Sequence, residues 1–187
     1  NIANSYTNSY NYDRTKESHL MKNSEWGAVA FLTHSKYGRK GQEVTINSNS
    51  SYYTGGGTGE AYKTTNTNQS STGNITGIYD LNGGAIEYVA AFNGNYSGEY
   101  YTGSSYVDAE GNNFANTGGK STKYATAYSG TLISSAYKRG DATYETTGWN
   151  GDNEFFITSD RTFFIRSGSY LAGSSAGIFY YNSVNGG

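Results

Sequence analysis

One long apolar segment stands out from an otherwise polar chain, and we expect the fold to be organised around it. The segment covers residues 74–92, and the Asn93-Gly94 turn signal follows it. Inside it, residues 78–81 and 85–92 have the apolar pattern of two extended pieces. Asn82-Gly83-Gly84 lies between them and accepts positive φ at little cost, so the pattern predicts two strands joined by a turn.

The second extended piece places a carboxylate among apolar residues. Strand alternation puts Ile86, Tyr88, Ala90 and Phe92 on one face and Glu87, Val89 and Ala91 on the other. A charge in apolar surroundings persists only when it is paired or hydrogen-bonded. Glu87 is therefore expected to have a partner from elsewhere in the chain.

Residues 20–35 predict the principal helix. Asn23 is the expected N-cap, and Glu25 lies in the first turn, where the helix dipole favours an acid. Gly27 weakens a helix by about 1 kcal/mol relative to alanine, so we expect a packing contact that requires a small residue there. Gly38 is the expected stop. The apolar side consists of Trp26, Val29, Ala30 and either Phe31 or Leu32.

The remaining pattern predicts short strands and long loops. Residues 48–73 hold almost no aliphatic side chain and indicate a long surface loop, and residues 93–123 indicate irregular structure with short hairpins. The sequence thus predicts a single α+β domain over residues 1–187, mainly β, with one principal helix and long irregular loops. Further strands are expected at residues 43–47, 131–137, 142–146, 154–158, 162–166 and 177–181.

Composition narrows the possible function. Charged residues make up 15% of the chain and the net charge is -2, so there is neither a basic footprint for nucleic acid nor a polybasic membrane patch. No apolar run is long enough for membrane insertion. The absence of cysteine excludes disulfides, thiol catalysis and thiolate metal sites.

The first residue and the residue usage favour export. The chain begins at Asn1 rather than Met, and it is rich in Gly, Tyr, Asn, Ser and Thr. This combination suits an extracellular protein of the bacterial cell surface better than a cytosolic enzyme. We expect the domain to be part of a longer exported chain.

Three blocks of the sequence, taken in order, resemble one known family. They are Leu-Met-Lys-Asn-Ser-Glu-Trp at residues 20–26, Gly-Ile-Tyr-Asp-Leu and Gly-Gly-Ala-Ile-Glu-Tyr-Val within residues 77–89, and Ile-Arg-Ser-Gly-Ser-Tyr at residues 165–170. They are similar to the helix start, the Gly-Leu-Tyr-Asp-Met and Gly-Asn-Val-Trp-Glu-Trp-Val motifs, and the Arg-Gly-Gly-Ser-Trp motif of the formylglycine-generating-enzyme family, also called the sulfatase-modifying-factor domain. The resemblance implies a C-type-lectin-like fold, as in exported bacterial surface or prepilin-type proteins.

Two departures from that family bear on function. The family's oxidase chemistry needs a pair of cysteines, which this chain lacks, so the resemblance implies no such catalysis here. The family's last strand, which ends in Gly-Phe-Arg, has no counterpart before Gly187. Either the sequence is truncated or the strand is supplied otherwise, for example by another subunit. What remains of the resemblance is a rigid core whose variable loops bind a ligand.

Four charged residues are expected to form a structural network. Glu87 and Arg166 occupy motif positions of the resembled family in apolar surroundings, and each is expected to find a counter-charge or backbone partners. Glu25 and Asp80 are expected to join them. The network is predicted to support the fold rather than a reaction.

Metal chemistry has few candidate ligands. His19 and His34 flank the predicted helix and cannot share one short metal-binding face, so the sequence favours neither a transition-metal site nor a catalytic triad. Calcium has more candidates, because oxygen ligands gather in two loops, although no EF-hand spacing occurs and acidic loops are usually just solvated. These candidates are Asp108, Glu110, Asn112 and Asn113 in one loop and Asp141, Asp152, Asn153 and Glu154 in the other. No other cofactor is expected.

Tyrosine in the loops is the most informative functional signal. Tyrosine combined with Ser, Gly and Asn makes adaptable recognition surfaces, although it equally suits a cysteine-free core and contacts between subunits. The expected ligand or subunit contacts are Tyr96, Tyr100, Tyr101 and Tyr106.

Three functional hypotheses follow. The first is a non-enzymatic adhesin or receptor-binding domain on a bacterial surface or pilus, which contacts a host or environmental glycan or protein. The second is a structural subunit that repeats in an extracellular pilus-like filament and binds copies of itself, which the missing last strand favours a little. The third is a hydrolase that uses Asp152 and Glu154 as paired carboxylates, and no recognisable motif supports it.

Overall fold

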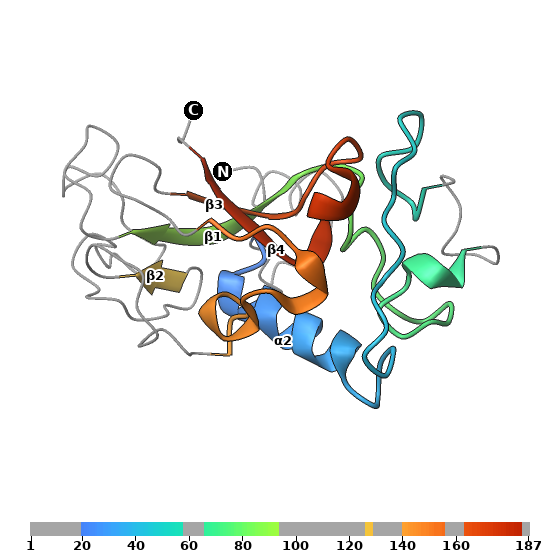
Figure 1. The fold of residues 1–187 in the computed structure, drawn as a ribbon, viewed down its shortest axis with the longest axis horizontal. Helices are drawn as coiled ribbons and strands as arrows, with labels where there is room; N and C mark the ends of the chain where they lie inside the picture. Colours follow the sequence, from blue (N-terminus) through green and yellow to red (C-terminus); the bar gives the residue numbers. More distant parts are fainter. Residues whose placement is uncertain (1–19, 58–65, 94–125, 129–139, 156–162, 185–187) are drawn as a thin grey trace, which may run out of the picture.

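A four-stranded sheet and one α-helix are the main regular elements in the part of the chain that the structure describes. The computed structural model describes residues 20–57, 66–93, 126–128, 140–155 and 163–184. Within these residues the strands have the order β2-β1-β3-β4, with β1, β3 and β4 antiparallel and β2 parallel to β1, and α2 packs against β1 and β4 (Figure 1). This confirms the α+β class. The elements are α2 (Asn23–His34), β1 (Glu87–Asn93), β2 (Thr126–Tyr128), β3 (Phe163–Ser167) and β4 (Gly177–Val184).

The predictions for β3 and β4 are confirmed. Both strands are runs of apolar and aromatic residues, and β4 extends beyond the predicted end to Val184. Between them Ser167 and Gly168 have φ values of 73° and 71°, which ends β3. β3 also pairs with β1, and this register sets Glu87 opposite Arg166.

The predicted helix exists, but its N-terminus is built differently. Lys22 is the N-cap, and its backbone N–H donates to Glu25 Oε2 at 2.9 Å. Asn23 is fully buried instead, and its Oδ1 accepts a hydrogen bond from Arg166. At the other end Leu32 is 61% exposed, so Phe31 is the residue that packs inward. Within the described residues no helix has both the length and the apolar character that a membrane crossing requires.

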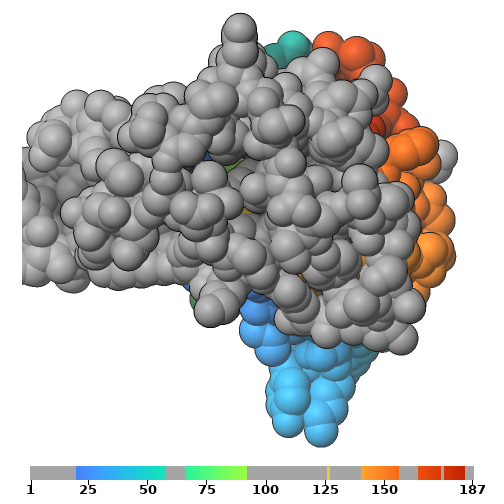
Figure 2. Space-filling model, turned by 90° about the vertical axis from the view of Figure 1, so that its left-hand side faces the viewer, coloured from blue at the N-terminus to red at the C-terminus, as the bar shows by residue number. Residues whose placement is uncertain are grey.

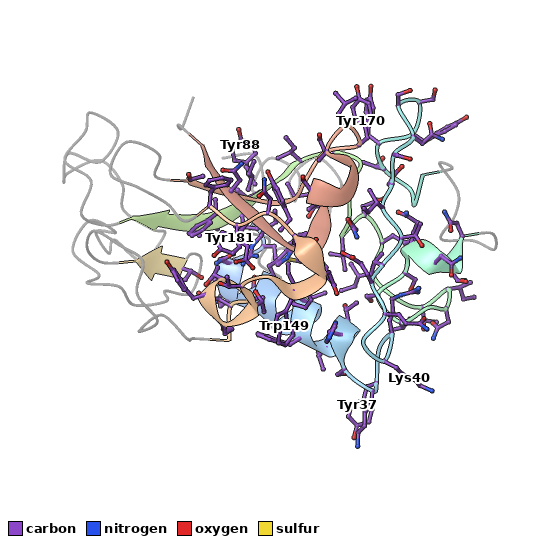
Figure 3. The ribbon with its side chains drawn as sticks, viewed as in Figure 1. Tyr37, Lys40, Tyr88, Trp149, Tyr170 and Tyr181 are labelled. Atoms are coloured by element: carbon purple, nitrogen blue, oxygen red, sulfur yellow. The ribbon has the colours of Figure 1, made fainter. Side chains whose placement is uncertain are left out.

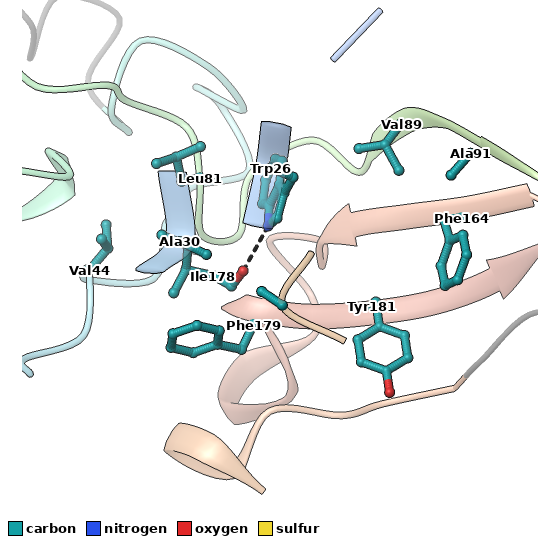
Figure 4. Packing of buried hydrophobic residues seen from close by; sticks show 11 residues of the cluster. Trp26, Ala30, Val44, Leu81, Val89, Ala91, Phe164, Ile178, Phe179 and Tyr181 are labelled. Carbon is teal, nitrogen blue, oxygen red and sulfur yellow. Dashed lines mark hydrogen bonds between the residues drawn. The ribbon is translucent and has the colours of Figure 1, made fainter. Parts of the chain in front are cut away.

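The core lies between α2 and the sheet. Trp26 is 1% exposed, and its indole N–H donates to the carbonyl oxygen of Ile178 at 2.8 Å, which joins the helix to β4 (Figure 4). Full burial of an aromatic ring with its polar group paired makes it a major source of stability. The buried cluster consists of Trp26, Ala30, Val44, Leu81, Val89, Ala91, Ala142, Phe164, Ile178, Phe179 and Tyr181.

Gly27 is required by a close approach of two backbones, as expected. A Cβ at this position would overlap with the backbone of Gly140 and Asp141. We predict that Gly27→Ala lowers the free energy of unfolding by about 1–3 kcal/mol, as overpacking does, although alanine is the better helix former. Urea unfolding measures this change. Ala28→Gly, at an exposed position of the same helix, is the control and should cost about 1 kcal/mol from propensity alone. A stabilised Gly27→Ala variant would contradict the close contact.

Three predicted strands are wrong. Residues 43–47, 78–81 and 142–146 carry no strand, and Tyr144–Thr146 forms a 3₁₀ turn instead. Their apolar residues are buried, but their backbone bonds go to irregular neighbours, as when the Thr45 N–H donates to the carbonyl oxygen of Asn68. Alternation of apolar residues here indicates that the side chains are buried. It does not show that the backbone pairs with another strand. The strand expected at 131–137 lies outside the described residues, as do residues 156–158 of the strand expected at 154–158. The described part of the latter forms only an isolated bridge between Glu154 and Tyr181.

The middle of the long apolar segment, residues 81–85, does not form a hairpin, and we call it the central segment because it bonds to loops on two sides. Residues 81–84 are all buried. The Gly83 N–H donates to the carbonyl oxygen of Ser167 at 3.0 Å, and the Gly84 N–H donates to that of Asn47 at 2.8 Å. The segment thus joins two loops that are far apart in the sequence.

The outer edge of β4 is already occupied along part of its length. The Phe179 N–H donates to Asp152 Oδ2 at 3.0 Å. The Tyr181 N–H donates to the carbonyl oxygen of Asn153, and the Tyr181 carbonyl accepts from the Phe155 N–H. A strand donated by another subunit therefore has no free edge at these residues, and this argument for a filament loses its basis there.

Candidate functional site

Most residues singled out from the sequence for ligand or metal contact cannot be placed. Tyr96, Tyr100, Tyr101 and Tyr106 lie outside the described residues, as do Asp108, Glu110, Asn112 and Asn113. The same is true of His19. Their proposed roles remain predictions.

The described residues contain a different aromatic surface, which we call the tyrosine corner and define as Tyr52, Tyr53, Tyr170 and Leu171. The rings of Tyr53 and Tyr170 lie 4.8 Å apart between centroids with an interplanar angle of 31°. Tyr52 is 50% exposed, Tyr53 45% and Leu171 77%. Tyr170 lies at the outer edge of the molecule (Figure 3). Two loops thus present partly exposed aromatic faces in one place.

Backbone hydrogen bonds from the central segment hold both loops of the corner. The Ala85 N–H donates to the carbonyl oxygen of Tyr53 at 3.1 Å, and the Tyr170 N–H donates to that of Gly84 at 2.9 Å. The Asn47 side-chain amide donates to the carbonyl oxygen of Tyr52 at 2.9 Å. Two adjacent residues, the buried Gly84 and the exposed Ala85, therefore anchor the backbones that carry the two rings, which lowers the entropy lost when a ligand binds.

Gly84 is the position on which this arrangement depends. Its φ is 73°, which favours glycine, and a Cβ there would overlap with the carbonyl oxygen of Tyr53. The close approach of the two chains is possible because the residue has no side chain.

The four residues of the tyrosine corner carry no charged side chain. No charged residue occurs from Val44 to Gly57 or from Ser167 to Val184. The Tyr53 phenol raises the pKa of Tyr170 through a side-chain hydrogen bond and charge repulsion, so the Tyr170 phenol is neutral at physiological pH. The surface offers aromatic faces and hydroxyl groups, which suit an uncharged polar or apolar ligand.

Sequence reasoning missed this surface for an identifiable reason. The rule that tyrosine in Ser/Gly/Asn-rich loops indicates recognition applies to many of the 20 tyrosines of this chain. Tyr52 and Tyr53 precede Gly55-Gly56-Gly57, and Tyr170 follows Ser167-Gly168-Ser169. Both loops thus have the composition that predicts recognition. The contact between the two loops depends on the central segment, so the sequence of either loop alone does not predict it.

A second partly exposed aromatic residue, Trp149, packs against the core. Trp149 is 38% exposed, and its ring lies 5.0 Å from His34 and 5.1 Å from Phe179 between centroids. His34 also contacts Phe179 at 5.5 Å. These contacts make His34 part of an aromatic cluster at the end of α2.

The charged residues of the predicted network divide into separate groups. Arg166 is fully buried, and its guanidinium donates to Asn23 Oδ1 at 2.8 Å and to the carbonyl oxygens of Ala142 at 2.8 Å and Asp141 at 2.6 Å. It also lies over the Tyr181 ring at 5.3 Å. The prediction that Arg166 is buried with backbone partners is confirmed.

None of the three carboxylates of that network pairs with Arg166 in the described residues. Asp80 accepts from the N–H groups of Gly55 and Gly56 and so holds the glycine-rich loop. Glu25 caps the start of α2. No hydrogen-bond or ion-pair partner of the Glu87 side chain lies within the described residues, where burial and the nearby Asp80 charge raise the Glu87 pKa to about 7. For Glu87 the expected partner is therefore not found in this part of the chain.

A cluster of three acidic residues lies against the start of β4. Asp152 is 6% exposed, and one of its oxygens accepts the Phe179 N–H. Burial raises its pKa to about 8, and the charges of Glu43 and Glu154 add to the rise. Burial also raises the pKa values of Glu43 and Glu154. These carboxyl groups are therefore expected to stay protonated to a higher pH than exposed carboxyl groups do.

The acidic cluster has a structural role in this geometry. Asp152 sits directly over Gly177, where a Cβ would overlap with its carboxyl group, and it fixes the edge of β4. Within the described residues, no group of three or more His, Cys, Asp or Glu side chains is arranged to hold a metal ion. A calcium role for Asp152 and Glu154 thus gains no support from the described residues. Their use as paired catalytic carboxylates stays a prediction.

Comparisons with known proteins add no family assignment. The chain matches no family model, no curated protein and no solved structure.

Proposed function

We propose that this chain is a non-enzymatic binding domain of an exported bacterial surface protein. It contacts a glycan or protein on another surface through aromatic side chains on its loops. In this proposal the fold is a divergent C-type-lectin-like, formylglycine-generating-enzyme-like domain, in which the sheet, α2 and the central segment hold the loops.

The tyrosine corner is the observation that supports the proposal. Tyr53 and Tyr170 come from separate loops, and both are anchored to Gly84 and Ala85 by backbone hydrogen bonds. Monomeric proteins expose single apolar residues at random, but a rigid group of aromatic residues indicates a contact surface. Ile86, which directly precedes β1, and Tyr88, which lies on β1, are also exposed, by 46% and 56%.

The alternative proposal is a structural subunit of an extracellular pilus-like filament. Tyrosine-rich surfaces suit contacts between copies as well as they suit a foreign ligand. The occupied edge of β4 removes one argument for it. Electron microscopy of native material decides: assembled fibres that contain this chain would favour the filament, and unassembled protein would favour the binding domain.

Binding to an array of surface glycans and proteins tests the proposal, and two alanine variants localise the contact. We predict that Tyr53→Ala combined with Tyr170→Ala weakens binding at least tenfold, because aromatic residues in a rigid patch contribute most of the binding energy. Tyr37→Ala is the matched control. Tyr37 is 77% exposed and lies at the opposite end of the molecule, beyond α2 (Figure 3).

Two results would overturn the assignment. The first is an array on which the native domain binds nothing, with or without calcium. The second is a ligand whose affinity falls for Tyr37→Ala and not for the double variant. Figure 2 shows why the control is informative, because the light-blue chain at the end of α2 and after it projects at the lower edge of the molecule.

A further inference from the structure

Tyr53 and Tyr170 form a pair whose geometry suits covalent chemistry as well as contact. Their ring centroids are 4.8 Å apart, and the two planes are inclined by only 31°. The backbones of both residues are fixed, because the Ala85 N–H donates to the Tyr53 carbonyl oxygen and the Tyr170 N–H donates to that of Gly84. Tyr53 is 45% exposed, so small oxidants reach the pair.

Other exposed tyrosines lack this arrangement. Tyr37, Tyr52 and Tyr88 are 77%, 50% and 56% exposed, which is more than Tyr53. Within the described residues, none of the three has a ring contact with another tyrosine. Exposure alone would therefore favour their oxidation, whereas proximity favours coupling between Tyr53 and Tyr170.

We propose that Tyr53 and Tyr170 are an intramolecular dityrosine cross-linking site, oxidised by a peroxide with a peroxidase or by another one-electron oxidant. The proposal does not rest on the proposed binding function. It concerns a bond between the loop at residues 48–57 and the loop at residues 168–172, which the central segment already holds side by side.

The chemistry balances with one equivalent of peroxide. Each phenol loses one electron and one proton to give a phenoxyl radical, and the two radicals join through the ring carbons next to their oxygens. Each coupling carbon then releases its hydrogen, which returns to the phenol oxygen as the ring regains aromaticity. The two phenols together lose two hydrogen atoms, and hydrogen peroxide accepts them and becomes two molecules of water.

The structure makes the pair suitable for each step. Tyr53 is 45% exposed, so water next to the pair can accept the proton that each phenol releases when it loses its electron. The anchored backbones of Tyr53 and Tyr170 keep the rings together during the radical lifetime. The product would be a covalent link between the two loops in a chain that has no cysteine for a disulfide.

Oxidation of the dilute, folded protein with peroxidase and hydrogen peroxide tests the inference. The expected result is a monomer that has lost two hydrogen atoms, with a linked peptide pair that contains Tyr53 and Tyr170 in the tandem mass spectrum. The Tyr53→Phe and Tyr170→Phe variants keep a ring at each position and should each lose this linked pair. Tyr52→Phe is the matched control and should retain it.

A second measurement separates folded geometry from chance collisions. The same reaction in urea should reduce the yield of the Tyr53–Tyr170 link at least tenfold, because the rings are no longer held together. The cross-linked native protein should also unfold at a higher temperature than the oxidised Tyr53→Phe variant, because the link closes a loop in the unfolded chain. The proposal is overturned if no Tyr53–Tyr170 peptide forms, or if it forms equally well in urea.

Discussion

Replacement of Arg166 by methionine is expected to lower the free energy of unfolding by about 3–5 kcal/mol, as measured by urea denaturation. The guanidinium is fully buried and donates to Asn23 Oδ1 and to the carbonyl oxygens of Asp141 and Ala142. Methionine fills a similar volume and donates no hydrogen bond. The variant would leave these acceptors in the core without their donor, and α2 would lose its link to β3.

Arg39 provides the matched control. It is partly exposed and also donates to backbone carbonyl oxygens, those of Glu43 at 3.1 Å and of Thr67 and Ser70 at 3.4 Å each. Water can replace these longer bonds, so Arg39→Met should cost only about 1 kcal/mol. Similar losses for the two variants, or a loss below about 1 kcal/mol for Arg166→Met, would contradict the central role of Arg166.

Asp152→Asn is expected to make the protein more stable than the parent at pH 9, by about 3–5 kcal/mol. Burial and the neighbouring Glu43 and Glu154 charges raise the folded-state pKa of Asp152 from 3.8 to about 8. The folded protein therefore holds a proton that the unfolded chain releases, and the stability of the parent falls as the pH rises from about 4 to about 8. Asparagine cannot ionise, and it can still accept the Phe179 N–H.

Urea unfolding across pH 4 to 9 measures this effect. Near pH 4 the two proteins should have similar stability, and the difference should grow until about pH 8 and then level off. Asp152→Ala is the control, because it removes the charge together with the acceptor for Phe179 and should be destabilised near pH 4. A parent whose stability does not fall between pH 4 and 8 would show that Asp152 ionises freely.

Helices and strands could be predicted from the sequence where a local residue pattern was enough to specify the backbone conformation. β3 and β4 are short aromatic and apolar runs between Ser and Gly residues, and α2 has an acid in its first turn and a buried tryptophan. The N-cap at Lys22 escaped prediction because Glu25 alone caps the helix while Asn23 binds Arg166. A residue type that suits a cap can be taken by a tertiary contact instead.

Irregular buried segments could not be predicted in the same way. Val44, Leu81 and Ala142 are core residues, and their spacing indicated strands, but their backbones bond to loops. Periodicity reports which side chains are buried, and it is silent on what the backbone hydrogen-bonds to. The tyrosine corner could not be predicted for the same reason, because the backbone hydrogen bonds of Gly84 and Ala85 bring Tyr53 and Tyr170 together.

The most direct test of the account is a proton NMR spectrum of the domain with labelled tyrosine rings. The account predicts nuclear Overhauser contacts between the Tyr53 and Tyr170 rings in the free protein, and shifts of these two rings when a ligand found on the array is added. The Tyr37 ring should not shift. Absence of contacts between Tyr53 and Tyr170, or ligand shifts confined to other rings, would contradict the claim that a preformed tyrosine corner is the contact surface.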